Sequence, residues 1–350
     1  MIDLVDYGWT PTMLPECAEG IPARVTAAHR ERYEIICEHG TIYGKLKTSI
    51  YYVQGEEFPT VGDFILLQYE PAGDSLIIKT LPRKSFFSRR LAGTVQGEQA
   101  VAANFDTVLV TTSLNKDFNI HRLERYLTLA WQSGATPAVV LTKADLADDC
   151  GAIIRAAEEI AVGVDVIAVS AVTGQGLDRL FEYLQPGKTA VFLGSSGVGK
   201  SSLVNALAGE KLMDVNAIRE NDNRGRHTTT HRQLFMLPFG AMVIDTPGMR
   251  ELGMWDVSSG LGEAFPDVDK VLARGCRFTD CSHLTEPGCS VKAAVKSGEL
   301  AAERWERYLK LRHEAKYVSD RAGFMRERGE LHKSISKRIK NMKKNGGLKK

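Results

Sequence analysis

The chain has 350 residues, a formal net charge of +2 and an apolar content of 43%. At roughly 150 residues per domain, this length predicts two or three domains, and the composition excludes a wholly disordered, collagen-like or coiled-coil protein. No apolar run approaches the roughly 18 residues that span a bilayer, and the acidic N-terminus lacks the basic and apolar regions of a secretory signal. We therefore expect a cytoplasmic protein with no membrane partner.

Charge is distributed unevenly along the chain. Residues 1–23 contain four acidic residues and no Lys or Arg, whereas residues 331–350 contain eight basic residues and no acid. Residues 79–90 hold five more bases without an acid, interleaved with Phe86 and Phe87. Such a stretch is either a solvated linker or a nucleic-acid contact. Because clustered bases release counterions from a phosphate backbone, the two basic segments favour polyanion binding.

Short β-rich runs follow a predicted N-terminal extension over residues 1–20. They are residues 23–28, 33–40, 42–46, 50–55, 63–70 and 75–81. Five or six short strands in about sixty residues suit a small closed barrel, so we predict an OB-fold over residues 21–82. Spacing alone leaves a β-sandwich or an SH3-like barrel open.

From about Asn104 the pattern changes to near-continuous apolar runs that alternate with helix-like segments. Runs of this kind are typical of parallel strands covered on both faces, which predicts an α/β nucleotide-binding domain over residues 83–255. Strand signals fade after Gly260, so residues 256–350 are predicted as a helical domain. Residues 301–318 form an amphipathic helix there, and we expect its aromatic stripe to pack against the neighbouring domain.

Residues 194–201 read GSSGVGKS and match G-x-x-x-x-G-K-[ST] in the strand–loop–helix context that a phosphate-binding loop requires. Backbone N–H groups of the loop would bind phosphates, Lys200 would neutralise the β/γ oxygens in catalysis, and Ser201 would ligate Mg²⁺. The predicted phosphate-binding residues are Gly194, Ser195, Ser196, Gly197, Val198, Gly199, Lys200, Ser201 and Ser202.

Two downstream motifs complete the phosphate side of the predicted site. In DTPG at residues 245–248, Asp245 would hold Mg²⁺ and the Gly248 N–H would meet the γ-phosphate. In GRHTTT at residues 225–230, Thr229 is our choice among three adjacent threonines for a catalytic Mg²⁺ contact. Ras-like enzymes have a catalytic glutamine where this chain has Met249. His227 is therefore the candidate that positions water, the alternative being that it contacts RNA or phosphate.

The base is predicted to be guanine. Thr142, Lys143 and Asp145 fit the [NT]-K-x-D pattern, in which the carboxylate accepts hydrogen bonds from guanine N1–H and N2–H, groups that adenine does not offer. Ser170 and Ala171 follow another strand-like run and supply the usual second contact, a backbone N–H to O6. A site with such paired groups discriminates against a ligand that lacks them by a factor of roughly 10⁴ to 10⁵. We therefore predict binding of GTP rather than ATP.

The motifs occur in a permuted order, since the guanine motifs precede the phosphate loop. A sheet survives circular permutation when its original termini lie close together, because packing depends on neighbours in space. The segment after Asp245 then leads directly into the C-terminal region, so nucleotide state could be transmitted to that region through the chain itself.

Four potential metal ligands cluster near the end of the chain: Cys276, Cys281, His283 and Cys289. Three thiols and one imidazole form a closed tetrahedral set, which predicts one structural Zn²⁺ rather than a catalytic one. The alternatives are free thiols, or a disulfide, which the cytoplasm disfavours.

These motifs, in this order, closely resemble the bacterial ribosome small-subunit-dependent GTPase A family. The resemblance covers essentially the whole chain, and it is specific because the permutation, GRHTTT and the segment RGCRFTDCSHLTEPGC coincide. It implies an N-terminal OB-fold and a GTPase in late maturation of the small (30S) ribosomal subunit, stimulated by that subunit. It also implies that the barrel and the zinc domain bind ribosomal RNA.

Two other functions compete with this interpretation. The protein could be an RNA-binding placeholder in which GTP acts as a conformational lock and hydrolysis is incidental. It could also be a P-loop kinase or metabolic NTPase, for which the guanine motif would have to be coincidental. No dimerisation heptad is visible, which favours a monomer.

Overall fold

The structure is a computed structural model, and it describes residues 2–14, 18–29, 32–53, 55–90, 98–115, 118–146, 150–213, 232–245, 258–283 and 286–319. The chain forms two compact units, Met1–Gly253 and Met254–Lys350. The predicted domain boundaries at residues 20, 82 and 255 stay predictions. The predicted site residues His227, Thr229 and Gly248 lie outside the described residues. None of the helices in the described ranges is long and apolar enough to cross a membrane.

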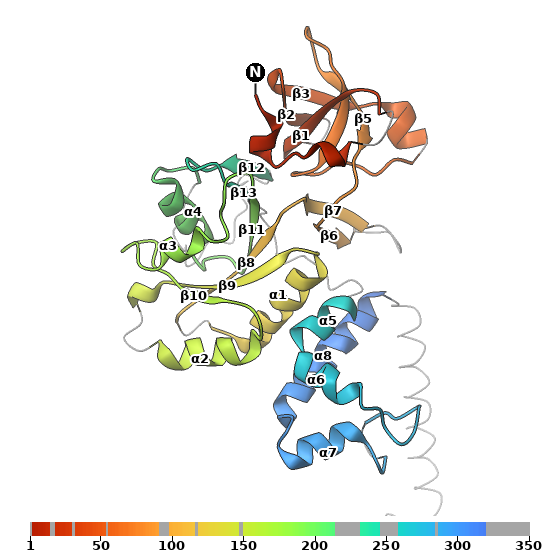
Figure 1. Cartoon of the computed structure of the whole chain (residues 1–350), viewed down its shortest axis with the longest axis vertical. Helices are drawn as coiled ribbons and strands as arrows, with labels where there is room; N and C mark the ends of the chain where they lie inside the picture. Colours follow the sequence, from red (N-terminus) through yellow and green to blue (C-terminus); the bar gives the residue numbers. More distant parts are fainter. Residues whose placement is uncertain are drawn as a thin grey trace, which may run out of the picture. The chain divides into compact units, whose positions relative to one another are not determined.

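The first strands close into a five-stranded barrel (Figure 1). β1 pairs with both β2 and β4, β3 lies parallel to β5, and β4 and β5 are antiparallel, which is the arrangement of an OB-fold and confirms the predicted β-barrel. The strands are β1 (Ile21–Ala28), β2 (Tyr33–Cys37), β3 (Gly40–Leu46), β4 (Phe64–Gln68) and β5 (Ser75–Thr80). The short helices η1 (Leu4–Tyr7) and η2 (Pro11–Met13) precede them, and Leu4 and Trp9 are buried with Phe64 and Leu66.

The prediction that residues 50–55 form a strand is wrong. Their aromatic and β-branched residues are instead part of a single π-helical turn, η3 (Ser49–Val53). Because β3 pairs with β5, the chain between β3 and β4 must cross over and cannot add to the barrel wall. Tyr51 is buried in the barrel core, and its hydroxyl lies 3.0 Å from the Thr80 hydroxyl.

The basic stretch at residues 79–90 is folded rather than a solvated linker, so that interpretation is wrong too. It enters a two-stranded hairpin of β6 (Phe86–Arg90) and β7 (Glu98–Ala103). The Arg83 guanidinium lies 2.8 Å from the buried Asp63 carboxylate, and the ring of Phe87 stacks on Phe105 at 4.9 Å. Burial raises the pKa of Asp63, and hydrogen bonds from Arg83 oppose that shift.

The predicted nucleotide-binding part is a largely parallel sheet with the strand order β10-β9-β8-β11-β13-β12. Only β12 is antiparallel to its neighbour β13. The hydrophobic runs that predicted parallel strands correspond to five of these strands, whereas the short β12 was not predicted. The strands are β8 (Thr107–Ser113), β9 (Thr136–Thr142), β10 (Val166–Ala168), β11 (Thr189–Leu193), β12 (Gln233–Met236) and β13 (Met242–Asp245).

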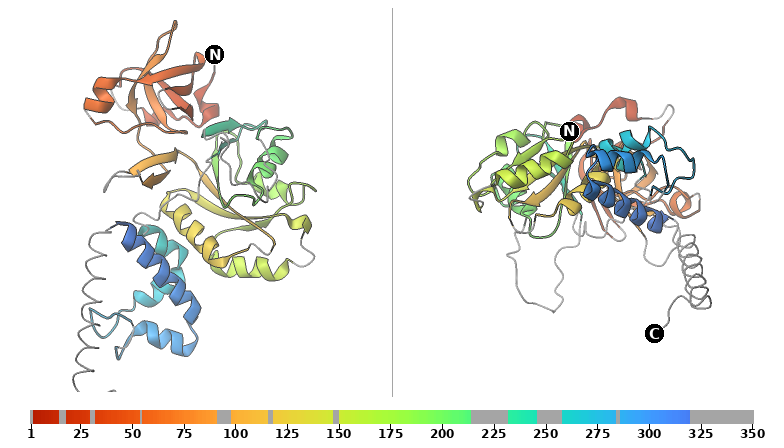
Figure 2. Two further views of the ribbon diagram at one scale, coloured as in Figure 1. Left: turned by 180° about the vertical axis from the view of Figure 1, so that it is seen from behind. Right: turned by 90° about the horizontal axis from the view of Figure 1, so that it is seen from below.

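Helices cover both faces of this sheet (Figures 1 and 2). Residues of α3 and α4 share one buried cluster with the strands, including Leu180, Leu203 and Phe192. Right-handed crossovers from β8 to β9 and from β9 to β10 put α1 and α2 on the other face. The helices are α1 (Ile120–Gln132), η4 (Ala144–Leu146), α2 (Gly151–Ile160), α3 (Leu177–Leu180) and α4 (Lys200–Ala208).

Arg24 of the barrel joins the barrel to the sheet. Strand β1 pairs with β12 at Ala27 and Gln233, so that the two structures share hydrogen bonds. The Arg24 side chain is fully buried, and desolvation lowers its pKa to about 10. It donates hydrogen bonds to backbone oxygens at 2.6, 3.0 and 3.2 Å, and these acceptors belong to Tyr7, Asn104 and Gly62. A buried cation held by several elements fixes their relative positions.

Replacing Gly62 with alanine is expected to destabilise the first unit by about 2–4 kcal/mol. Gly62 has φ +91°, and a Cβ added there would lie 2.1 Å from the Ala103 carbonyl oxygen. Gly55→Ala is the matched control, because Gly55 has φ +77° but nothing within 4 Å of the added Cβ. Urea unfolding of both variants separates the effect of the clash from the effect of the backbone strain. Equal unfolding midpoints for the two variants would contradict the predicted clash.

The second unit is helical. It contains α5 (Ser258–Ala264), α6 (Pro266–Leu272), α7 (Ser290–Ser297) and α8 (Ala302–Ser319). The side chain of Arg304 is buried, donates to Asp267 and to the Ala264 carbonyl oxygen, and lies over the Phe265 ring. Two rings of the α8 aromatic stripe, which was expected to pack on the neighbouring domain, contact rings of this unit. Trp305 lies against His283 and Tyr308 against Phe265.

Candidate functional site

The predicted phosphate loop occupies the connection from β11 to α4. Gly197 and Gly199 have φ +79° and +100°, which side-chain-bearing residues rarely adopt, and Gly194 is pressed against β8, where an added Cβ would lie 2.3 Å from the Thr111 oxygen. The Lys200 ammonium donates to the carbonyl oxygens of Gly194 and Ser195 at 2.8 and 2.7 Å. The Lys200 side chain therefore folds back over the predicted phosphate loop.

The predicted guanine motif contacts this loop directly. Thr142 is the last residue of β9, and its hydroxyl donates to the Val198 carbonyl oxygen. Lys143 has φ +61°, and its ammonium donates to the Gly197 carbonyl oxygen at 2.9 Å. Strands β9, β8 and β11 are parallel, so their carboxyl ends meet at one edge of the sheet. The two motifs are thus parts of one site despite their permuted order.

Asp145 and Ser170 lie together at the same edge. Asp145 is in η4, and its carboxylate accepts a hydrogen bond from the buried Ser170 hydroxyl. That hydroxyl also accepts from the N–H groups of Val172 and Thr173 at 3.2 and 3.1 Å, which fixes the turn that contains Ala171. The hydroxyl therefore orients one carboxylate oxygen of Asp145.

Asp245 ends β13, next to β11 in the sheet. Burial raises the pKa of this carboxyl group, and the positive charge of Lys200 opposes the shift. Ser201 lies in the first turn of α4. Hydroxyl and carboxylate oxygens are the ligands that Mg²⁺ prefers, so Ser201 and Asp245 are suited in chemistry to the predicted metal.

Sequence reasoning missed Arg122 at this site. Its guanidinium donates to the Ser195 hydroxyl at 3.3 Å, from the first turn of α1. The contact joins residues 73 positions apart, so neither spacing nor a motif could have found it.

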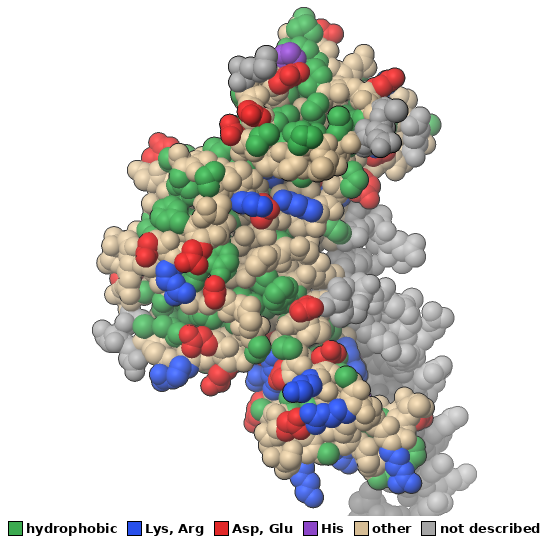
Figure 3. All heavy atoms as spheres, in the orientation of Figure 1, with side chains coloured by type: hydrophobic (Ala, Val, Ile, Leu, Met, Phe, Trp, Pro, Cys, Tyr) green, Lys and Arg blue, Asp and Glu red, His purple; other side chains and the backbone are tan. Residues whose placement is uncertain are grey.

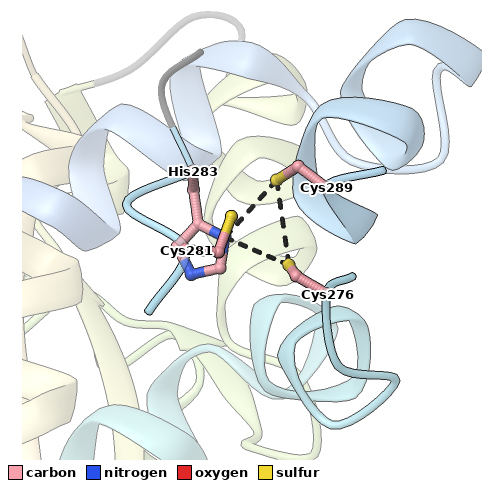
Figure 4. A group of neighbouring side chains, drawn as sticks. All are labelled: Cys276, Cys281, His283 and Cys289. Carbon is pink, nitrogen blue, oxygen red and sulfur yellow. Dashed lines mark hydrogen bonds between the residues drawn. The ribbon is translucent and has the colours of Figure 1, made fainter. Parts of the chain in front are cut away.

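The four predicted metal ligands of the second unit converge (Figure 4). Their ligand atoms lie within 4.8 Å of one another. The Sγ atoms of Cys276 and Cys289 are 3.9 Å apart, and His283 Nδ1 lies 3.5 and 3.4 Å from them. With Zn–S near 2.3 Å and Zn–N near 2.0–2.1 Å, a tetrahedral site has S–S and S–N edges of about 3.8 and 3.6 Å. The group has the size of a tetrahedral metal site.

The surroundings of Cys276 favour its thiolate, whereas burial raises the pKa of the Cys281 thiol to about 11. The Ser290 hydroxyl and N–H lie 3.3 and 3.4 Å from Cys276 Sγ, and these hydrogen bonds lower the pKa of that thiol to about 7. Cys289 caps α7 and accepts from the Lys292 N–H at 3.5 Å. Since the thiolate is the form that binds metal, Ser290 is a supporting residue that motif reading missed.

Comparisons with known proteins show the family of this chain. The family of RsgA GTPases matches residues 80–255. A Listeria monocytogenes protein named small ribosomal subunit biogenesis GTPase RsgA 2 is 46% identical over 317 residues, or 90% of each chain. A Methanosarcina acetivorans protein named small ribosomal subunit biogenesis GTPase RsgA is 40% identical over 93% of this chain and 88% of its own. The chain belongs to the RsgA GTPase family.

Two solved structures are similar to this chain in fold. YjeQ from Thermotoga maritima is 30% identical, with a TM-score of 0.63 over 84% of this chain and 98% of its own. YloQ, described as a circularly permuted GTPase, is 26% identical, with a TM-score of 0.60 over 85% of this chain and 96% of its own. The predicted fold class is therefore confirmed: a β-barrel, a circularly permuted GTPase domain and a C-terminal region with a Cys₃His cluster.

Proposed function

We propose that this RsgA GTPase binds GTP between residues 142–145 and the loop at 194–201, and hydrolyses it while assisting the biogenesis of the small ribosomal subunit. The contact of Lys143 with the Gly197 oxygen carries this proposal, because it joins the base-reading motif to the phosphate loop. The names of the relatives support the cellular role. A role in the biogenesis of ribosomal subunits implies a cytoplasmic protein.

Each group of residues has a distinct role in this proposal. Asp145 accepts hydrogen bonds from guanine N1–H and N2–H, and the turn after Ser170 offers the Ala171 N–H to O6. The loop N–H groups and Lys200 bind the phosphates. Mg²⁺, when bound with the nucleotide, neutralises phosphate charge, and Ser201, Asp245 and Thr229 would hold it.

Hydrolysis requires an oriented water. With Met249 at the position of the usual glutamine, His227 is the proposed residue that positions the water, and Gly248 the proposed contact to the γ-phosphate. We expect slow intrinsic turnover, and faster turnover when the small subunit orders the loop that carries His227.

Phosphate release from GTP and ATP, with and without small ribosomal subunits, tests this function. GTP hydrolysis accelerated by the subunits is the expected result, with ATP turned over far more slowly because Asp145 finds no donor pair on adenine. ATP preference would contradict the GTPase assignment. A His227→Ala variant that hydrolyses GTP normally would remove the role given to this histidine.

The second unit is proposed to bind one structural Zn²⁺ through its Cys₃His cluster and, with the barrel, to bind ribosomal RNA as a monomer. A closed set of three thiols and one imidazole suits zinc in chemistry and in size. On the face seen in Figure 3, Lys and Arg side chains are more frequent over the C-terminal helices than over the barrel. This distribution supports a contact between the second unit and a phosphate backbone.

Deleting residues 331–350 is expected to weaken association with small subunits and to flatten its dependence on salt. The segment carries eight bases, and each lysine or arginine that contacts a phosphate adds about one unit to the slope of log K against log salt. Co-sedimentation at several salt concentrations measures both effects. Unchanged binding at every concentration would exclude a role for the tail.

A further inference from the structure

Arg122 carries a positive charge to the phosphate loop from outside the predicted motifs. It is exposed in the first turn of α1, where the Asn119 side chain caps the helix by accepting from the Arg122 N–H at 3.0 Å. Its guanidinium donates to the Ser195 hydroxyl at 3.3 Å. Among the residues that the structure describes, no carboxylate pairs with it. A guanidinium that donates to a neutral hydroxyl would form a stronger, charge-assisted hydrogen bond with a phosphate oxygen.

The Arg122 guanidinium lies at the same end of the phosphate loop as the Lys200 ammonium. Both side chains contact Ser195: Arg122 at the hydroxyl, and Lys200 at the carbonyl oxygen, 2.7 Å away. In this motif the lysine reaches the β- and γ-phosphates of the nucleotide. The phosphate oxygens are therefore expected to lie close to the Lys200 ammonium. Because β8 runs parallel to β11 and leads into α1, the fold fixes Arg122 beside the loop.

The geometry points to Arg122 as a further catalytic residue, an arginine supplied by the chain itself that contacts the γ-phosphoryl group of GTP. This inference rests on the proposed GTPase function. In the reaction, a bond forms between the water oxygen and the γ-phosphorus, and the bond from that phosphorus to the bridging oxygen breaks. The electron pair stays on the oxygen of GDP, and the water proton leaves with the phosphate product. Arg122 is not consumed, and it stabilises the charge on the transferred group.

Arginines in this role contribute roughly 10³-fold or more to kcat. An Arg122→Ala variant is therefore expected to lose roughly 10³-fold in single-turnover GTP hydrolysis with small subunits, while its GDP affinity stays within about threefold of wild type. Affinity for GDP with aluminium fluoride, which imitates the transferring phosphoryl group, should fall together with the rate. Arg122→Lys keeps the charge but loses the planar pair of donors, so it should restore only part of the rate.

Arg155→Ala is the matched control, because Arg155 is an exposed arginine on α2 with no contact to the loop. It should hydrolyse GTP like wild type. Hydrolysis by Arg122→Ala within about twofold of wild type would overturn the inference. An equal loss of GDP affinity and rate would also overturn it, since Arg122 would then only bind the ground state. Absence of hydrolysis by wild type would refute the proposed function itself, and this inference with it.

Discussion

An Asp145→Asn variant is expected to bind GDP roughly 10⁴-fold more weakly than wild type. The asparagine side chain turns one acceptor into an N–H donor, which faces the N–H groups of guanine and leaves them unpaired. Asparagine keeps an oxygen that can accept from the Ser170 hydroxyl, so the local structure should persist. Binding of GDP and of xanthosine diphosphate, measured by calorimetry, tests this prediction. The xanthine 2-oxo group can accept from asparagine, so this ligand should regain affinity.

The matched control for this variant is Asp178→Asn, which changes an exposed carboxylate on α3. It should bind GDP like wild type, because it lies outside the proposed site. If Asp145→Asn also retained wild-type affinity for GDP, the carboxylate could not be the group that reads guanine.

Replacing Cys281 with serine is expected to remove the metal and unfold the second unit. Structural zinc contributes apparent binding free energies of about 10–16 kcal/mol, which is comparable with the roughly 5–15 kcal/mol that stabilises a typical domain. Removing the metal with a chelator should have the same effect on the wild type. The Trp305 ring lies against His283, with centroids 5.6 Å apart, so its fluorescence should report the loss. Zinc content by mass spectrometry gives the second readout.

Cys150→Ser is the control for the metal prediction. Cys150 is a free cysteine of the first unit, outside the cluster, so this variant should keep one zinc ion and the fluorescence of wild type. GDP binding by the first unit should survive chelation once Mg²⁺ is restored. A Cys281→Ser protein with full zinc content and unchanged fluorescence would exclude Cys281 as a ligand.

Much of the fold could be predicted because its signals are local. Apolar runs predicted the parallel strands. The motifs were assigned to the ends of strands such as β9, β11 and β13, and the carboxyl ends of these strands lie at one edge of the sheet. The four metal ligands lie within fourteen residues of sequence, so their convergence could also be predicted from spacing.

The features that sequence reasoning missed depend on contacts between distant residues. Residues 50–55 have strand-forming side chains, but the pairing of β3 with β5 forces the chain to cross over. The base-rich stretch at 79–90 is folded because Arg83 pairs with the buried Asp63. Arg24 and Arg122 also act through partners far along the chain, and neither belongs to a motif.

One nucleotide is expected to be bound at both ends by motifs encoded in permuted order. A crystal structure of the chain with GDP and Mg²⁺ tests it most directly. We predict a single GDP whose guanine edge lies within hydrogen-bonding distance of Asp145 and whose β-phosphate lies within that distance of the Lys200 ammonium. A GDP whose base lies away from Asp145 while its phosphates occupy the loop would contradict the claim.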